Sequence, residues 1–406
     1  MSRLTLMRAL RSRVIDGVLG YTRSVFPQDF VFGAATSAYQ YEGAAAEDGR
    51  SPTIWGTENE RQRYRGDVAA YGYHKYKGDV KLMAETGLEA YRFSISWSRF
   101  IPNGRGAVIQ EGLKYYNNVI DELAKRGILP HIMLYHLDLP QALEDEYDGW
   151  EDFTAYADVC FREFGDRALQ KGIVGVNMLS LWSYPLTNSI ADLQADQRYR
   201  DFSLPTSDEE KCRFSSSILN KVQTELVKGA VDFIGINHYY FLYVNDRPLV
   251  EGVRDYVADR SVSYRVSKTD PPTEQHDPAQ YPNDPKGLQL ALEYLREYYG
   301  DFPIYIQENG KGSRNDSLLD DTDRVDYIKG YIGGVLDAIR NGVNVRGYFV
   351  WSFVDVLDLL DGYQTRYGLY RVDFDDGALP RRARRSTRWY SDFVRSKQDP
   401  VLIAQQ

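Results

Sequence analysis

The chain has 406 residues, of which 43% are hydrophobic, and it carries a formal net charge of −9 at pH 7. This length allows either two domains of average size or one large α/β barrel. The negative charge argues against nucleic acid as a partner. Aromatic residues make up 14% of the chain and include 32 tyrosines. The ring and polar hydroxyl of tyrosine suit a sugar ligand, although tyrosines also fill cores and surfaces.

Residues 1–24 hold five arginines against one acid, and the arginines interrupt every apolar run. We expect no signal-peptide core and no membrane-spanning segment there. We predict a disordered leader over 1–24, with an organelle transit peptide as the alternative. One barrel domain is predicted over 25–396 and a short tail over 397–406.

The cysteines and histidines form no pattern typical of a metal site or a disulfide framework. Cys160 lies in a stretch with helical periodicity, Cys212 lies in a polar stretch, and the five histidines are dispersed. We therefore expect no metal and no cofactor.

From residue 26 onward, apolar runs that predict strands alternate with amphipathic stretches that predict helices. This alternation predicts a parallel sheet, and its repetition in one chain predicts a closed (β/α)8 TIM barrel. The predicted strands are a segment that starts at 30, then 90–96, 129–136, 174–182, 231–244, 303–308 and 345–352. The predicted helices are 77–86, 112–126, 153–164, 188–202, 287–299, 321–340 and a terminal segment around 389.

The strand at 303–308 ends on a carboxylate. It reads Pro-Ile-Tyr-Ile-Gln-Glu and is followed by Asn-Gly, which is a turn signal. Glu308 is therefore expected at the carboxyl end of a buried strand, which is the end that carries catalytic groups in barrels. The alternative is a polar residue that only terminates the strand.

Other predicted strands also end on polar or aromatic residues. In a barrel the carboxyl ends of all strands meet at one rim, so these side chains are predicted to share one pocket. A doubly wound sheet, the structural alternative, would not place all of them around one centre. The residues are Gln40, Arg92, His136, Asn237, Tyr239, Glu308 and Trp351.

Several of these segments resemble a known family. Residues 91–100 read Tyr-Arg-Phe-Ser-Ile-Ser-Trp-Ser-Arg-Phe, 135–141 read Tyr-His-Leu-Asp-Leu-Pro-Gln, and 232–239 read Asp-Phe-Ile-Gly-Ile-Asn-His-Tyr. The pattern resembles glycoside hydrolase family 1, the retaining β-glucosidases, and its plant members in particular. The further segments of the resemblance are 30–43, 306–310 and 351–369. The resemblance implies a small-molecule β-glucoside as the partner, and neither nucleic acid nor a membrane.

The resemblance also implies a role for each residue of the site. Glu308 matches the nucleophile, which must be ionised, and Arg92 and Tyr239 match the groups that hold it charged and oriented. The sugar-binding positions are Gln40 and His136 for the hydroxyl groups, Trp351 beneath the ring, Asp358 in place of the usual Glu, and Tyr367 as the aromatic residue that follows. Taken singly, His136 and Trp351 are equally explained as core residues and Arg92 as a structural ion pair.

One part of the family pattern is absent. A retaining glycosidase needs a second carboxyl group about 5–5.5 Å from the nucleophile, and in the family it is the Glu of a Thr-x-Asn-Glu-Pro motif that ends the fourth strand. The sequence contains no Glu-Pro, and residues 168–172 join the third helix directly to the next predicted strand. We therefore predict a barrel without its fourth strand and helix, and a second gap between 202 and 231. Glu144 and Glu146 are weak candidates for a substitute acid.

The resemblance implies retaining hydrolysis of O-linked β-D-glucosides that releases glucose, and we expect it to be impaired because the acid/base Glu is absent. One alternative is a catalytically inactive protein that binds glycosides. The other is a non-functional product of splicing or of gene prediction. Each explains why intact motifs flank abrupt gaps.

A basic run lies near the end of the chain, where Arg381, Arg382, Arg384 and Arg385 are almost consecutive. Such a run is typical of a nuclear address or of a solvated face. We expect the solvated face.

Overall fold

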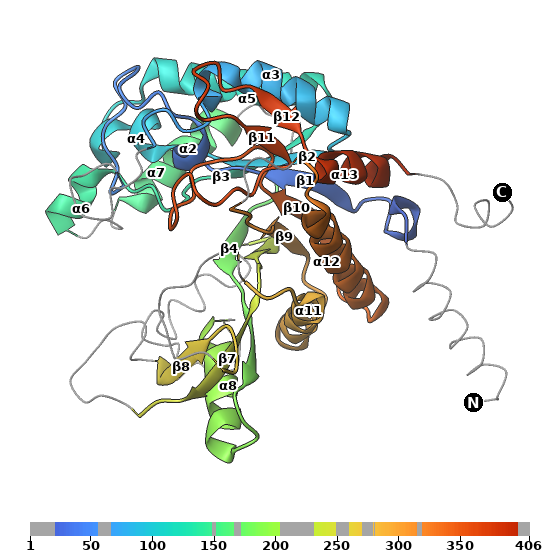
Figure 1. Cartoon of the computed structure of the whole chain (residues 1–406). Coiled ribbons are helices and arrows are strands. Elements are labelled where there is room, and N and C mark those ends of the chain that lie inside the picture. Colours follow the sequence, from blue (N-terminus) through green and yellow to red (C-terminus); the bar gives the residue numbers. More distant parts are fainter. Residues whose placement is uncertain are drawn as a thin grey trace, which may run out of the picture.

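A parallel β-sheet forms the centre of the structure, which is a computed structural model that describes residues 21–55, 66–147, 152–165, 172–203, 231–248, 260–269, 279, 281–314 and 319–396 (Figure 1). The seven strands lie in the order β3-β2-β1-β10-β9-β6-β4. Their bounds are β1 Val31–Ala35, β2 Ala90–Ser94, β3 Leu129–Met133, β4 Gly175–Leu179, β6 Phe233–Asn237, β9 Ile304–Asn309 and β10 Val345–Trp351. Because every pair in this sheet is parallel, all carboxyl ends lie at the same rim, as the sequence predicted.

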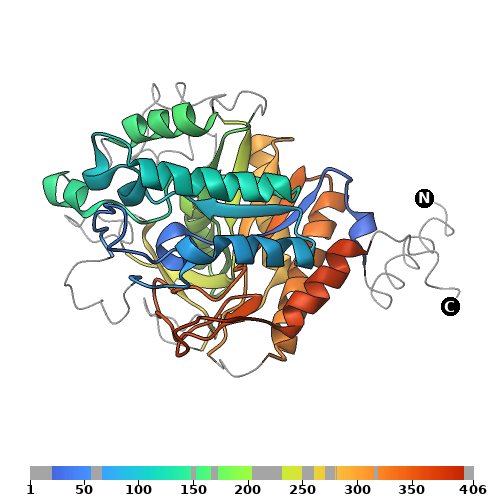
Figure 2. The same cartoon turned by 90° about the horizontal axis from the view of Figure 1, so that it is seen from above.

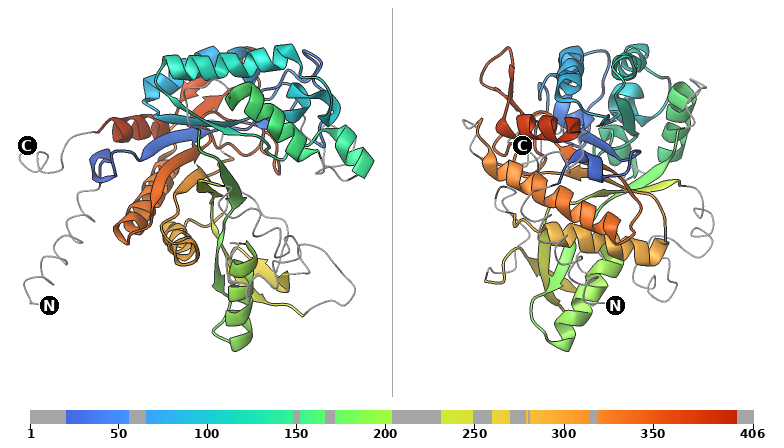
Figure 3. Two further views of the ribbon diagram at one scale, coloured as in Figure 1. Left: turned by 180° about the vertical axis from the view of Figure 1, so that it is seen from behind. Right: turned by 90° about the vertical axis from the view of Figure 1, so that its right-hand side faces the viewer.

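Most of the long helices lie along the outer face of the sheet. Figure 2 shows α3 and α5 side by side across one part of it, and in Figure 3 α11 lies beside α12. The long helices are α3 Gly72–Thr86, α5 Gln110–Lys125, α7 Phe153–Cys160, α8 Ile190–Ser203, α11 Pro285–Tyr299, α12 Thr322–Arg340 and α13 Arg385–Arg395. The short elements are α2 Ala38–Tyr41, α4 Trp97–Phe100, α6 Gln141–Tyr147, η1 Arg23–Val25, η2 Pro102–Gly104 and η3 Phe161–Gly165.

The helix α5 illustrates why these segments are helical. Its buried side chains include Tyr115, Tyr116, Val119 and Leu123, which recur every three or four residues and so lie on one face. The helix α3 ends where the sequence predicted, at Gly87, whose φ of +87° suits glycine.

Two of the predicted strands are each divided into two. The first, 174–182, becomes β4 and β5 (Trp182–Pro185), and the second, 231–244, becomes β6 and β7 (Phe241–Asp246). In both cases the first half stays in the parallel sheet and the second half joins β8 (Val262–Arg265) in a separate three-stranded sheet. This smaller sheet packs on α8 and lies below the main sheet in Figure 1. The prediction of two single long strands was therefore wrong.

The parallel sheet is strongly curled. The ring of His131 on β3 lies 4.6 Å from the ring of Phe349 on β10 and 5.4 Å from that of Tyr305 on β9. The strands β3 and β9 are separated by three others in the sheet. Contact between their side chains requires the sheet to roll up around an interior, as in a barrel.

The two end strands of the sheet, β3 and β4, each have one neighbour among the described residues. Their apolar side chains are partly exposed: Leu129 on β3 is 53% exposed, and Val176 and Leu179 on β4 are 45% and 59% exposed. The described part of the chain thus forms an α/β fold with an open, seven-stranded, curled sheet.

The packed structure already includes the end of the predicted leader. Arg23 is buried, and its guanidinium lies 3.3 Å from the carboxylate of Glu89. Residues 1–20 and the predicted tail from 397 lie outside the described residues.

Candidate active site

Glu308 lies at the carboxyl end of β9, next to an irregularity in the sheet. Ile236 on β6 pairs with Ile306, but the next residue, Asn237, pairs with Glu308, so Gln307 is an extra residue on β9. A bulge of this kind redirects the side chains beside it. Here Gln307 faces His131 across the interior, with 3.4 Å between the two side-chain nitrogens, and Glu308 turns toward the rim.

Side chains from several strands converge on the Glu308 carboxylate, which is only 3% exposed. Arg92 Nη1, from β2, donates to Oε1 over 2.6 Å, and the Tyr239 hydroxyl, just after β6, donates to Oε2 over 2.5 Å. Asn237, the partner of Glu308 in the pairing of β6 with β9, lowers the pKa of this carboxylate through its side-chain amide. His136, after β3, has its Nδ1 3.7 Å from Oε1. The structure therefore brings these predicted site residues together.

Burial raises the pKa of Glu308, while Arg92 and then the hydrogen bonds from Tyr239, Arg92 and Asn237 act against this rise. The guanidinium of Arg92 is itself buried, so protonation of Glu308 would leave a positive charge without its counter-ion. The pair therefore favours an ionised carboxylate.

His136 is neutral at neutral pH. Burial first, and the charge of Arg92 second, hold the pKa of its imidazole well below the usual value. Its ring stacks on Trp351, with 5.8 Å between the ring centres and 12° between the planes. A neutral imidazole next to an aromatic face can donate or accept a hydrogen bond without adding charge to the site.

Three further predicted residues belong to the loop between β10 and β11 (Tyr370–Val372) or contact it. Gln40 is tied to this loop, since its Nε2 donates to the Leu357 carbonyl over 2.6 Å while its Oε1 accepts from the Ser37 hydroxyl over 2.7 Å. Asp358 accepts from the backbone N–H groups of residues 360 and 361, and burial raises the pKa of its carboxyl. The Tyr367 ring lies edge-on to that of Tyr239, at 6.3 Å.

A layer of polar residues behind Glu308 was not predicted from the sequence. Asn309 Nδ2 donates to the His238 carbonyl over 2.6 Å, and the Tyr348 hydroxyl donates to Asn309 Oδ1 over 2.5 Å. The hydroxyls of Tyr327 and Tyr331 both donate to the Tyr239 carbonyl. The only signal in the sequence was the spacing of these two tyrosines, four apart on one helix face.

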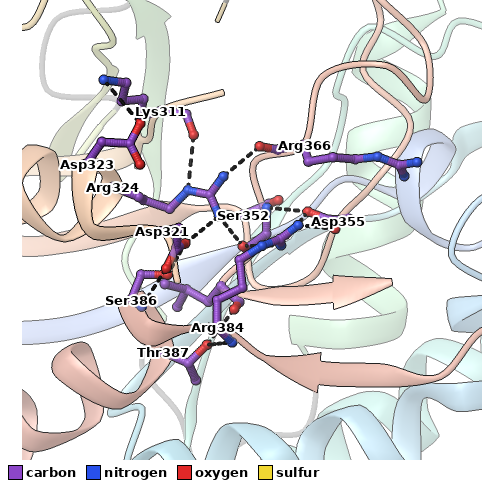
Figure 4. A network of polar contacts seen from close by, with 12 residues as sticks. Lys311, Asp321, Asp323, Arg324, Ser352, Asp355, Arg366, Arg384, Ser386 and Thr387 are labelled. Carbon is purple, nitrogen blue, oxygen red and sulfur yellow. Dashed lines mark hydrogen bonds and ion pairs between the residues drawn. The ribbon is translucent and has the colours of Figure 1, made fainter. Parts of the chain in front are cut away.

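The basic run near the end of the chain also differs from its prediction. Arg384 is buried, and its two Nη atoms each lie 2.9 Å from an oxygen of Asp355 in the loop after β10. Arg324 on α12 donates to the carbonyl of Gly368 over 2.6 Å, and Arg384 donates to the same oxygen over 2.8 Å. Figure 4 shows both arginines pointing at this loop. The prediction of a solvated face was therefore wrong for Arg384, which fixes the backbone beside Tyr367.

The two weak candidates for a substitute acid lie on α6, at the molecular surface. Glu146 forms an exposed ion pair with Arg105 over 2.9 Å, and Glu144 is exposed. No group of three potential metal ligands was found within the described ranges. Nor does any helix in those ranges have the length and apolar character needed to cross a membrane.

Comparison with known proteins gives consistent matches. A family described as "Glycosyl hydrolase family 1" matches residues 22–170 and 167–399. The chain is 66% identical to "Beta-glucosidase 2" of Oryza sativa subsp. japonica, over 97% of both chains, and 57% identical to "Beta-glucosidase 3" of the same organism, also over 97% of both. The crystal structure of a rice β-glucosidase superimposes with a TM-score of 0.85 at 32% identity, covering 93% of this chain and 100% of that one.

Two details of these matches concern parts of the family fold that this chain lacks or divides. The family match is divided into two parts that meet at residues 167–170. The alignment with the first relative runs over 484 positions, which is 78 more than the 406 residues of this chain, so at least that many positions of the relative have no counterpart here.

Proposed function

Because the chain belongs to glycosyl hydrolase family 1, we propose that it cleaves O-linked β-D-glucosides through a covalent intermediate on Glu308. The glycoside hydrolase class follows from the family, and the roles of single residues are part of the proposal. The observation that carries it is the buried Glu308 carboxylate held by Arg92 at 2.6 Å and by the Tyr239 hydroxyl at 2.5 Å.

In the proposed first step a Glu308 oxygen attacks the anomeric carbon of the glucoside. A bond forms between that oxygen and C1, and the bond from C1 to the leaving oxygen breaks, with its electron pair on the leaving group. Arg92 and Tyr239 hold the carboxylate ionised and aimed. In the second step the oxygen of a water molecule forms a bond to C1 and loses a proton to solvent. The bond from C1 to Glu308 breaks with its electron pair on the carboxylate, and the β configuration is restored.

We propose that Gln40, His136, Trp351, Asp358 and Tyr367 bind the glucose ring. A sugar that reaches Gln40 must exchange the existing hydrogen bonds of its amide to Ser37 and Leu357. These bonds also place the backbone of the loop that carries Asp358, so sugar binding and loop position are coupled at Gln40.

We further propose that the fourth strand and helix of the family fold are absent, together with the acid/base Glu. Support comes from β3 and β4, each of which has one neighbouring strand among the described residues, from the division of the family match at 167–170, and from the lack of a Glu-Pro in the sequence. Without a general acid, a poor leaving group departs roughly 10²–10⁴-fold more slowly. Activated glucosides, whose leaving groups need no proton, are therefore the expected substrates.

The test is labelling with 2,4-dinitrophenyl 2-deoxy-2-fluoro-β-glucoside followed by intact mass and peptide mapping. We expect a gain of one fluoroglucosyl unit on Glu308 and none in Glu308→Gln. Azide, which needs no general base, is expected to accelerate turnover of an activated glucoside. No labelling of the folded wild-type chain would contradict the proposal.

The missing acid/base favours one alternative, a glycoside-binding protein without catalysis. Calorimetric titration of the wild-type chain with glucose and cellobiose distinguishes the two. Binding heat without labelling of Glu308 supports the alternative, and labelling excludes it.

A further inference from the structure

We propose that Asn177, on the edge strand β4, is a positioning residue that fixes the Asn237 side chain and thereby orients Glu308. This inference rests on the proposed function, in which Glu308 must be ionised and aimed. Sequence analysis did not single out Asn177, which lies in the middle of a predicted strand.

A chain of side chains connects β4 with β9. Asn177 Nδ2 donates to Asn237 Oδ1 over 3.1 Å. Asn237 is the partner of Glu308 in the pairing of β6 with β9, and its side-chain amide lowers the pKa of the Glu308 carboxyl. An ionised carboxylate only accepts hydrogen bonds, so Asn237 must turn its NH2 group toward Glu308. Its oxygen then faces β4 and needs a donor, which Asn177 supplies.

The surroundings of Asn177 support a role beyond stability. Its own Oδ1 is buried and has no hydrogen-bond partner among the described residues. A buried acceptor without a donor is unfavourable, and an apolar side chain of similar size would avoid it. The amide also fits only because residue 235 is glycine, since a Cβ there would lie 2.7 Å from Asn177 Oδ1.

Three other side chains face the Glu308 carboxylate directly: Arg92 from β2, His136 after β3 and Tyr239 after β6. Among the described residues, Asn177 forms a hydrogen bond with Asn237 and with none of these three. A substitution at Asn177 therefore reaches Glu308 through Asn237. Asn177→Leu releases the amide of Asn237, whereas the isosteric Asn177→Asp replaces the donor with an acceptor and turns the Asn237 oxygen toward Glu308.

The experiment measures the titration of Glu308 by carboxyl ¹³C NMR in the full chain. The resonance is assigned by its loss in Glu308→Gln. We expect the midpoint to rise by about half a pH unit or more in Asn177→Leu and further in Asn177→Asp, because ionised Glu308 loses a donor. Val176→Leu, a change of the adjacent and half-exposed residue, is the control and is expected to leave the midpoint unchanged.

A double-mutant cycle shows whether Asn177 acts through Asn237. In an Asn237→Ala background, Asn177→Leu is expected to cause no further shift. A shift of equal size in that background, or an unchanged midpoint in the single variant, overturns the proposal. If Asn177→Leu does not fold, an unchanged midpoint in Asn177→Asp overturns it instead. The titration needs no turnover, so failure of fluoroglucoside labelling would count against the proposed function alone.

Discussion

Arg92 Nη1 lies 2.6 Å from Glu308 Oε1, and the two side chains are 2% and 5% exposed. The pair joins β2 to β9, which are separated by two other strands in the sheet. Both charges are removed from water, so each depends on the other, and loss of one leaves the partner as a buried, uncompensated charge. The same contact thus stabilises the rim and, in the proposed function, keeps the carboxylate ionised for attack.

Arg92→Met is expected to slow the labelling of Glu308 by roughly 10²–10³-fold at pH 7, as for the loss of one preorganised charge partner. Without the guanidinium, burial raises the pKa of Glu308 further, and the protonated acid does not attack. In a pH profile of the labelling rate, the fall toward acidic pH should therefore begin at a higher pH in Arg92→Met than in the wild type.

The matched control is Arg99→Met, which breaks a second buried ion pair, with Glu42, at 2.9 Å. It is expected to lower stability but to leave labelling of the folded fraction within about threefold of wild type. Equal labelling rates in Arg92→Met and wild type would show that Arg92 does not activate Glu308.

Asp138 predicts a pH dependence of stability. Burial, opposed mainly by Arg50, raises the pKa of its carboxyl from 3.8 to about 8. The folded state therefore binds a proton that the unfolded state has released, and the resulting stabilisation is complete below pH 3.8 and is lost as pH rises to about 8. Asp138→Asn removes this dependence.

The free energy of unfolding of both proteins is to be measured by denaturant titration between pH 5 and 9. As pH rises, the free energy of unfolding of Asp138→Asn is expected to increase by about 1–3 kcal/mol relative to that of the wild type. Asp145→Asn, at an exposed position of α6, is the control and should show no trend. A constant difference for Asp138→Asn would mean that the carboxyl is already ionised at pH 5.

The strand ends could be predicted from the sequence because local signals determine them. A β-branched run that stops at Glu-Asn-Gly has few alternatives, and the parallel order then places Arg92, Asn237 and Glu308 at one rim. The residues that the sequence predicted at the ends of these strands accordingly lie together in the structure.

Contacts that depend on distant pairing could not be predicted. Whether Arg384 faces water or Asp355 depends on how α13 docks beside the loop after β10, and the arginine cluster itself is the same in both cases. The division of 174–182 and 231–244 into two strands each has the same origin, because β5 and β7 leave the sheet to pair with each other. Tertiary pairing overrides local strand propensity here.

Asp355→Asn is expected to destabilise the fold by roughly 3–5 kcal/mol, the cost of leaving a buried charge unpaired. Asp355 is fully buried and accepts hydrogen bonds from both Nη atoms of Arg384 and from the N–H groups of Gly368 and Val372. The control, Asp337→Asn, removes an exposed pair with Arg340 and should change stability by less than about 1 kcal/mol. Similar denaturation midpoints for the two variants would refute this account.

The strand β4 has one neighbour among the described residues, and its other edge predicts self-association. Unpaired strand edges bind other edges, and proteins usually protect them with charges or proline. The strand β3 contains Pro130, whereas β4 has neither a proline nor a charged residue, and its Val176 and Leu179 are half-exposed. We expect the wild-type chain to associate with increasing concentration in sedimentation velocity and Val176→Lys to remain monomeric.

The control, Val68→Lys, places the same charge at a residue that is 52% exposed outside the sheet, and it should associate like wild type. If both lysine variants associate equally, another surface is responsible.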